Sequence, residues 1–514
     1  MGMRGKQASR FFMERLRQTL KESSRYLLLG SLVYAPWAYG CTLPWAAALL
    51  DGLLAVVVLL WLAGCAVGRS RPMLPPVALS CALALICLGL FMAWNAHFRY
   101  NPETYCFALV QAPAGRLPGA IDRGCALAAT GHAAVLLGFF LCVCDTAGGK
   151  LWRRRILAVM GLCGASIMLL GLLQRATGAS MIFWQPGPAD GVFFGTFYYH
   201  GNAGAFINAV LPLCAAFGGR ALYRQGSEGG RALWIPAFLL CLGAAAVNVS
   251  RAGSLLSALL AGAIAVYELR AARGRLFSRL SAVAAIVAVC GALAVLALTA
   301  GEEQAWAKWG QLKSQLKDED NPRYLVNVVN WEMARDAGSC GFGPGTFEMA
   351  FPHYTGPLGY ALRGVWRYAH QDYLQAIIEW GWGGAALWMV LLFGGMARLL
   401  GRHPEPDVRL RFACGLALAA LALHALVDFP FQIPSIQLYA AALAGVGWAR
   451  EKKVIFPGQA VRRNTGAALP GQFLIVFSPD HKEPGEIAPS GPRGGRWRSR
   501  RWGCGPGAGP RTRH

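Results

Sequence analysis

The sequence predicts an all-α polytopic membrane protein with about twelve transmembrane helices. Of its 514 residues, 55% are hydrophobic and only 15% are charged, whereas soluble domains average about 25% charged residues. The formal net charge is nevertheless +23. Nucleic-acid-binding proteins gather basic residues on a soluble face, but membrane proteins place them in short cytoplasmic loops. We therefore expect membrane lipids as partners and no nucleic acid.

Twelve apolar stretches are long enough, or nearly so, to cross a bilayer. Helices are the expected structure because they satisfy their own backbone hydrogen bonds in lipid. The stretches cover residues 26–41, 44–67, 74–95, 124–144, 156–177, 199–219, 232–250, 252–269, 280–300, 373–397, 411–428 and 434–449.

The charges alternate along the connections between these stretches. Every second connection is rich in Lys and Arg, and so are both ends of the chain. The positive-inside rule then places both termini in the cytoplasm. The longest connection, 301–371, carries seven basic and eight acidic residues, and we expect it to be extracytoplasmic.

Four regions follow from this topology. We expect a basic cytoplasmic arm over 1–25, without a separate signal peptide, and a first group of transmembrane helices over 26–150. A second transmembrane region covers 151–450 and includes the periplasmic loop 301–371. The tail 451–514 is rich in Gly, Pro and Arg and lacks apolar periodicity, so it is predicted to be a disordered basic cytoplasmic segment.

The outer loop contains signals of short amphipathic helices. Asn321 is a candidate N-cap, Pro322 suits the first helical position, and Gly338 suits the C-terminal stop. Apolar residues at helical spacing predict that one face of this helix lies on the membrane surface; they are Leu325, Val328, Val329 and Met333. The following GFGPGTF segment (341–347) favours a tight structural turn over a phosphate-binding loop.

Three ionisable residues lie near the predicted outer ends of spans. His370 begins HQDYLQAIIEWGWGG at the edge of the tenth span, where it is either a polar anchor or a general base. Arg251 separates two apolar runs, and an embedded cation needs an anionic partner, either Asp428 or a bound pyrophosphate. Arg323 offers a second guanidinium or is simply a solvated charge.

These segments together resemble the O-antigen ligase and O-antigen polymerase superfamily of bacterial polytopic glycosyltransferases. The family's outer-loop pattern is a His, then Asn, Ser or Gln, nine residues, a Gly, two residues and a small residue. His370, Gln371, Gly381 and Gly384 fall on that pattern. Further similarity lies in Arg323 with Trp331, GFGPGTF, GTFYYHGNAGAFINAVLPL (195–213), SRAG (250–253) and HALVDFPFQIP (424–434), over roughly 150–450.

The resemblance implies a GT-C-like fold and a metal-independent, inverting transfer without a cofactor. A glycan would pass from an undecaprenyl-pyrophosphate carrier to an acceptor hydroxyl at the periplasmic face of the bacterial inner (cytoplasmic) membrane, in lipopolysaccharide or exopolysaccharide biosynthesis. His370 would be the general base, and Arg251 and Arg323 would stabilise the pyrophosphate. Candidate substrate-binding residues are Gln371, Tyr373, His200, Asn202, Gln174 and Asp428, although His200 and Asn202 equally suit a polar helix start.

The acceptor stays open among a growing glycan, lipid A core and a protein hydroxyl, the last being the reaction of a protein O-oligosaccharyltransferase. A transporter or flippase of a lipid-linked glycan or small solute is the alternative from another functional class. Transporters place ionisable groups near the midplane between related halves, whereas here the candidates gather at the predicted outer side and no internal repeat is visible.

Overall fold

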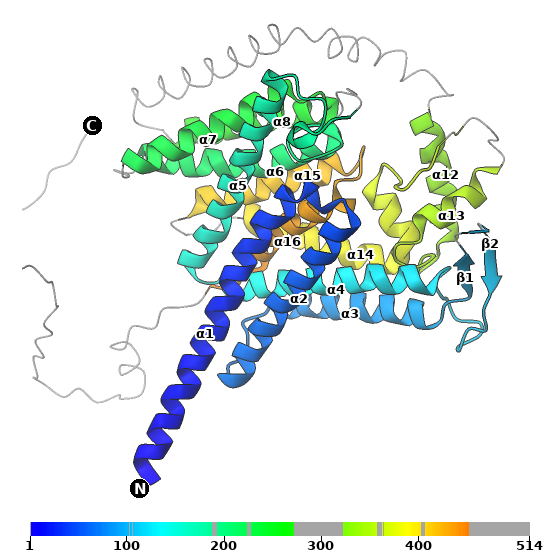
Figure 1. The fold of residues 1–514 in the computed structure, drawn as a ribbon, viewed down its shortest axis with the longest axis horizontal. Helices are drawn as coiled ribbons and strands as arrows, with labels where there is room; N and C mark the ends of the chain where they lie inside the picture. Colours follow the sequence, from blue (N-terminus) through cyan, green and yellow to red (C-terminus); the bar gives the residue numbers. More distant parts are fainter. Residues whose placement is uncertain are drawn as a thin grey trace, which may run out of the picture. The chain divides into compact units, whose positions relative to one another are not determined.

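The computed structural model describes residues 2–101, 103–104, 106–187, 193–223, 228–271, 322–356, 362, 364–401 and 407–451. The chain divides into two units, Met1–Lys452 and Lys453–His514, and the description that follows concerns the first (Figure 1). The predicted tail 451–514 therefore falls almost entirely outside the described residues.

Helices dominate this unit. The long helices are α1 (Gly2–Trp37), α2 (Pro44–Val67), α3 (Pro76–Trp94), α4 (Arg123–Thr146), α5 (Lys150–Ala176), α6 (His200–Tyr223), α7 (Glu228–Val247), α8 (Arg251–Ala271), α14 (Asp372–Leu400), α15 (Val408–His424) and α16 (Pro434–Trp448). Short elements are α12 (Pro322–Asp336), α13 (Phe347–Tyr354), and the 3₁₀ turns η1 (Tyr39–Cys41), η2 (Ile182–Trp184) and η4 (Pro430–Gln432).

Eleven of the twelve predicted spans coincide with long helices, and the twelfth, 280–300, lies outside the described residues. Within the described part, eight helices are long and apolar enough to cross a membrane: α2 to α8 and α14. Large apolar side chains on their outward faces, such as Leu59 and Leu83, are exposed, as lipid-facing residues are. The chain is a multi-pass membrane protein, while the count of twelve spans and their sidedness stay predictions.

The fold also contains a small sheet that the all-α prediction missed. Strands β1 (Phe98–Asn101) and β2 (Cys106–Leu109) pair antiparallel between α3 and α4, with Phe98 opposite Leu109. The hairpin is too short to produce a clear alternating pattern in the sequence. Cys106 lies on β2 and Cys125 on α4, and both are free thiols.

Helix α14 differs from the uninterrupted span predicted over 373–397. Its helical geometry breaks at Gly381, whose φ is +68°. A Cβ atom at this position would clash with the backbone of Ser339 and Cys340. The backbone groups freed by the break are satisfied by the preceding loop: Trp382 N donates to Gly338 O at 3.0 Å, and Phe342 N donates to Ile378 O at 2.8 Å.

Helix α12 begins at Pro322, as predicted, and Gly338 adopts a positive φ just after its end; Asn321 lies outside the described residues. The buried face differs from the predicted one. Val326, Val329 and Met333 pack in a cluster with α13 and the start of α14, whereas Val328 is 40% exposed. The helix therefore buries its apolar side against protein, and Figure 1 shows α12 beside α13.

Helix α6 is central to the packing. It is almost completely buried and contacts α7, α8 and α15. One end of α6 begins at His200 beside the residues that precede α14, and we call this the His370 end. The other end carries Arg220 beside Asp407, and we call it the Asp407 end.

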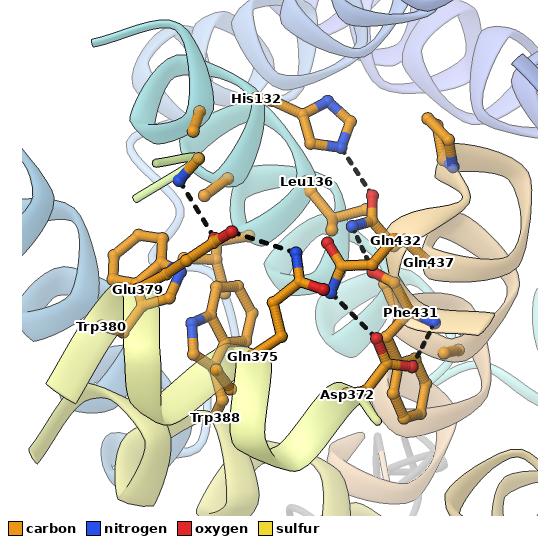
Figure 2. A pocket seen from close by; sticks show the side chains of 18 of the residues that line it. His132, Leu136, Asp372, Gln375, Glu379, Trp380, Trp388, Phe431, Gln432 and Gln437 are labelled. Carbon is orange, nitrogen blue, oxygen red and sulfur yellow. Dashed lines mark hydrogen bonds between the residues drawn. The ribbon is translucent and has the colours of Figure 1, made fainter. Parts of the chain in front are cut away.

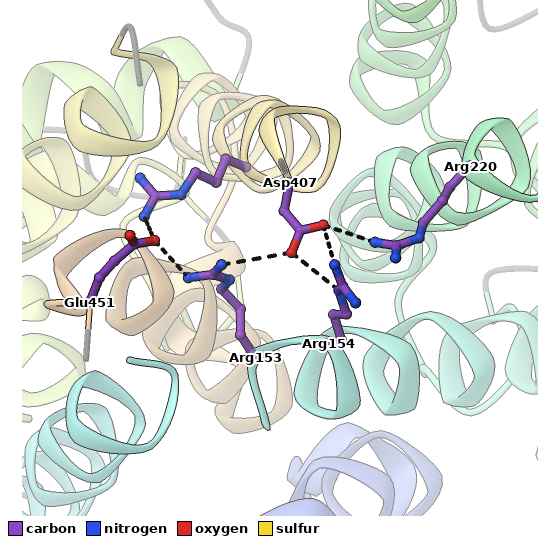
Figure 3. Close-up of polar contacts among 6 residues, drawn as sticks. Arg153, Arg154, Arg220, Asp407 and Glu451 are labelled. Atoms are coloured by element: carbon purple, nitrogen blue, oxygen red, sulfur yellow. Dashed lines mark hydrogen bonds and ion pairs between the residues drawn. The ribbon is translucent and has the colours of Figure 1, made fainter. Parts of the chain in front are cut away.

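At the Asp407 end, one buried carboxylate joins three helices (Figure 3). Arg154 donates two hydrogen bonds to Asp407, at 2.7 and 3.1 Å, and Arg220 donates a third at 2.8 Å. Burial alone would raise the pKa of Asp407, but the Arg154 hydrogen bond and the surrounding guanidinium charges hold it below its usual value. The network fixes α5 and α6 to the start of α15.

Candidate functional site

Segments distant in the sequence meet at the His370 end. His370 immediately precedes the capping residue of α14, and Asp428 lies beyond the end of α15. His370 Nδ1 is 3.5 Å from Asp428 Oδ1, and His424 Nε2 is 3.9 Å from Asp428 Oδ2. The Asp428 side chain is 7% exposed and that of His370 is 25% exposed, so the pair is sheltered while the imidazole keeps access from outside.

Arg323 reaches the same cluster through Tyr199. This tyrosine precedes α6, and its hydroxyl accepts a hydrogen bond of 3.1 Å from Arg323 Nη2, while the negative charge of Asp428 acts on the same phenol. Burial, then the negative charge of Asp428, raises the pKa of Tyr199 to about 12 against the opposing effect of Arg323. The phenol is therefore protonated at neutral pH and links the guanidinium to the carboxylate.

Asp428 itself is stabilised as a carboxylate. Burial opposes ionisation, but the neighbouring imidazoles of His370 and His424, together with the charge of Arg323, hold its pKa well below the usual value. A fixed negative charge beside an imidazole orients the ring and stabilises its protonated form.

Aromatic rings enclose the imidazole. Phe429 meets the His370 ring edge to face at 4.6 Å and stacks on Tyr368 at 4.7 Å, while Trp366 lies 5.3 Å from His370 on another side. His370 also has a φ of +52°, a conformation that costs a non-glycine residue about 1–3 kcal/mol and is found most often at functional sites. The surrounding packing therefore holds His370 in one strained orientation.

The start of α6 contacts this cluster and also α8. A Cβ atom at Gly201 would clash with the Asp428 carboxylate, so the glycine allows α6 to approach the pair closely. Asn248 donates a hydrogen bond of 3.1 Å to the carbonyl of His200, and Gly204 packs against Gly253 of α8. Arg251, the first residue of α8, is therefore at the His370 end.

Four other predicted site residues lie outside the pairing of His370 with Asp428. Gln371 is the N-cap of α14 and accepts a hydrogen bond of 2.6 Å from Leu374 N, and the Tyr373 hydroxyl donates to Ala422 O at 2.7 Å. The first contact caps α14 and the second joins α14 to α15, so Gln371 and Tyr373 both have a structural role. Asn202 and Gln174 are buried, and their side-chain oxygens have no hydrogen-bond partner among the described residues. No contact in that part of the chain brings Gln174 to His370.

The described residues contain no group of three or more His, Cys, Asp or Glu side chains arranged to hold a metal ion. The charged groups that the cluster offers a ligand are instead one imidazole, one carboxylate and the guanidinium of Arg323. Such a set can move a proton and bind an anion.

Residues 236–389 match the model of the protein family described as O-antigen ligase. The match supports the similarity of this segment to the O-antigen ligase and polymerase superfamily. No curated protein matches the chain. The match is narrower than the similarity predicted over 150–450, but it includes Arg251, Arg323 and His370. The superfamily implies a membrane glycosyltransferase of ligase or polymerase type that acts on a lipid-linked glycan, in agreement with the multi-pass architecture.

Sequence reasoning missed Tyr199, His424 and Phe429, which complete the cluster around His370 and Asp428. A signal was present, because Tyr199 and Phe429 directly neighbour residues that the sequence did single out, namely His200 and Asp428. Their role depends on the approach of α6, α14 and α15, and a sequence pattern within one segment does not contain that information.

Proposed function

We propose that this O-antigen ligase-type protein transfers a glycan from an undecaprenyl-pyrophosphate carrier to an acceptor hydroxyl at the periplasmic face of the bacterial inner membrane. The observation that carries the proposal is the pairing of His370 with Asp428 at 3.5 Å, in one cluster with the cation Arg323. A base and a phosphate-binding cation side by side are what this reaction requires.

His370 is assigned as the general base. An imidazole changes protonation near neutral pH and suits the removal of a proton from a hydroxyl group in the transition state. Asp428 positions the ring and stabilises the imidazolium that forms. The acceptor oxygen then attacks the anomeric carbon from the face opposite the leaving group, so the configuration at that carbon inverts.

Arg323 and Arg251 are assigned to the leaving group. As the anomeric C–O bond breaks, its electron pair passes to the carrier pyrophosphate, where negative charge grows. Guanidinium groups match phosphate oxygens with paired hydrogen bonds, and cations fixed in advance stabilise this charge without reorganising. In this proposal the two arginines, and no metal ion, neutralise the pyrophosphate.

Reconstitution in vesicles tests the proposal against transport. The purified protein is supplied with a labelled carrier-linked glycan and an acceptor, and both the carrier linkage and the sidedness of the label are followed. Loss of the carrier linkage with formation of a new glycoside is the expected result. A change of sidedness with the linkage intact would identify a flippase and overturn the proposal.

Glycan length analysis in a deletion strain separates the acceptor classes. Accumulation of polymer on the carrier indicates a ligase, whereas loss of polymer with single repeats retained on the core indicates a polymerase. Loss of glycan from a protein, with surface polysaccharide unchanged, indicates a protein O-oligosaccharyltransferase.

A further inference from the structure

Figure 2 shows a cavity of about 530 Å³. Tyr368, which stacks on Phe429 of the His370 cluster, is among its lining residues. The cavity is a half-open pocket lined by residues of α2, α4, α13, α14 and α16, by the η4 turn, and by the segments that precede α13 and α14. This volume lies within the range of small-molecule binding sites in proteins. None of the residues assigned to proton transfer or to the pyrophosphate lines this cavity, so the proposed transferase mechanism leaves it unexplained.

One wall of the cavity is polar and ordered by hydrogen bonds. His132 on α4 lies between Asp51, with Nδ1 2.6 Å from Oδ1, and Gln437, with Nε2 2.7 Å from Oε1. Farther along, Gln432 donates to Asp372 at 2.9 Å. These acids and amides lie within spans or at their ends, and such groups in a membrane protein mark functional sites by default.

A second acid–amide pair continues this wall along α14. Gln375 donates to Glu379 at 3.0 Å, and Gly345 N donates to the other carboxylate oxygen of Glu379 at 3.0 Å. Each carboxylate oxygen can accept more than one hydrogen bond. The wall therefore presents hydrogen-bonding groups at fixed positions, which suits a ligand carrying several hydroxyl groups.

The remaining walls are apolar. Trp380 and Trp388 meet at 81° with their ring centroids 5.8 Å apart, and alanine and leucine side chains of α4 and α16 complete the lining. Aromatic faces pack against the C–H faces of sugar rings, and the aliphatic part suits a hydrocarbon chain. The cavity thus matches an amphipathic ligand with a hydroxyl-rich head.

The charge of the lining disfavours an anionic head. The acids that line the cavity are Asp51, Glu348, Asp372 and Glu379, and the only arginine among the lining residues, Arg367, pairs with Glu348 at 3.6 Å. A carboxyl group, ionised or not, does not neutralise a phosphate as a guanidinium does. The pyrophosphate of a donor therefore fits the Arg323 side of the cluster, and an uncharged ligand fits the cavity.

Two stacked aromatic rings connect the cavity to the proposed base. Tyr368 lines it and stacks on Phe429, whose ring contacts His370. A hydroxyl group on a sugar bound near Tyr368 would therefore need to extend past the rings of Tyr368 and Phe429 to reach the imidazole.

We propose that this cavity is a second binding site, separate from the pyrophosphate site, which holds an uncharged, hydroxyl-rich sugar ring of a lipid-anchored acceptor. The assignment of this sugar as acceptor rests on the proposed transferase function. The binding claim does not, because it concerns only the chemistry of the cavity.

Photolabelling in lipid vesicles tests the binding claim. The probe is an alkyl glycoside with a diazirine in its chain, and cross-linked peptides are located by mass spectrometry. We expect saturable labelling of α4, α14 or α16, competed by the unlabelled alkyl glycoside at least tenfold more effectively than by an alkyl phosphate of the same chain length. Equal competition by the phosphate, or no labelling of these helices, overturns the proposal.

Two variants address the cavity in different ways. Gln437→Leu removes a polar partner, whereas Ala376→Phe fills the space and leaves the polar wall intact; each should reduce labelling at least fivefold. Glu268→Gln, a carboxyl change outside the cavity lining in the pair with Arg409, is the matched control and should label normally. Labelling that survives both cavity variants contradicts the proposal.

Kinetics connect the cavity to the acceptor. In the reconstituted transfer assay, Gln437→Leu should raise KM for the acceptor at least fivefold while KM for the donor stays within twofold, a split that a general loss of structure would not produce. Labelled cavities without transfer by the wild type would overturn the proposed function and leave the sugar site standing. Transfer by the wild type without labelling of the cavity would overturn the sugar site and leave the proposed function standing.

Discussion

Replacing Asp428 with Asn tests how the carboxylate acts on His370. The substitution keeps the size of the side chain but removes its charge, 3.5 Å from His370 Nδ1. At that distance two unit charges attract by about 1 kcal/mol in a water-like medium and about 5 kcal/mol at an effective dielectric constant of about 20. Since about 1.4 kcal/mol corresponds to a factor of ten in rate, the imidazolium formed in the transition state should lose roughly 10-fold to 10³-fold of rate.

The assay is the initial rate of glycan transfer in vesicles containing equal amounts of folded protein. Asp336→Asn is the matched control, because Asp336 is an acid on α12 that accepts a hydrogen bond of 3.0 Å from the Tyr354 hydroxyl, away from the cluster. The rate of this variant should stay within twofold of wild type. A rate for Asp428→Asn that is also within twofold of wild type would refute the assignment of Asp428 as a positioning residue.

Two further predictions concern the fold. Gly381→Ala should lower the melting temperature and the transfer rate, because φ is +68° and the new Cβ would clash with the backbone of the preceding loop. Gly262 has open space around it, so the control Gly262→Ala should be neutral or stabilising by up to about 1 kcal/mol. Equal melting temperatures of the two variants would contradict the clash at Gly381. Asp407→Asn should destabilise the protein at pH 7, because it leaves the buried guanidinium of Arg153 and the partly exposed ones of Arg154 and Arg220 without their carboxylate. The pKa of Asp407 is lowered in the folded state. The carboxylate therefore contributes to the free energy of unfolding above the unfolded-state pKa of about 4, and this contribution is lost as the pH falls through the folded-state pKa. Thermal melts of wild type and variant should therefore converge in acid, and melting curves that stay equally far apart would contradict this.

The helical architecture follows directly from the sequence because lipid imposes it. A run of apolar residues such as 44–67 has only one compact way to satisfy its backbone within a bilayer, and the observed α2 has these same bounds. The interruption of α14 was not predictable from its own residues, because Gly381 is compatible with a helix and breaks only where the loop after α12 approaches it.

The candidate site was partly predictable for a similar reason. His370 and Arg323 carry a family pattern within short segments, so the sequence could single them out. Their connection through Tyr199 depends on the approach of α6 and α12, which no local pattern records. Asp51 and His132 could have been found as ionisable residues inside apolar spans, but their pairing across two helices becomes visible only in the fold.

Transfer of a carrier-linked glycan by the His370→Ala variant tests the assignment of His370 as the general base. The variant is inserted into vesicles, its folding is verified by its melting temperature, and the new glycosidic product is measured against wild type. Because general base catalysis contributes about 10²–10⁴-fold, we predict a loss of that size with insertion and melting unchanged. Transfer at the wild-type rate by a folded His370→Ala protein would contradict it.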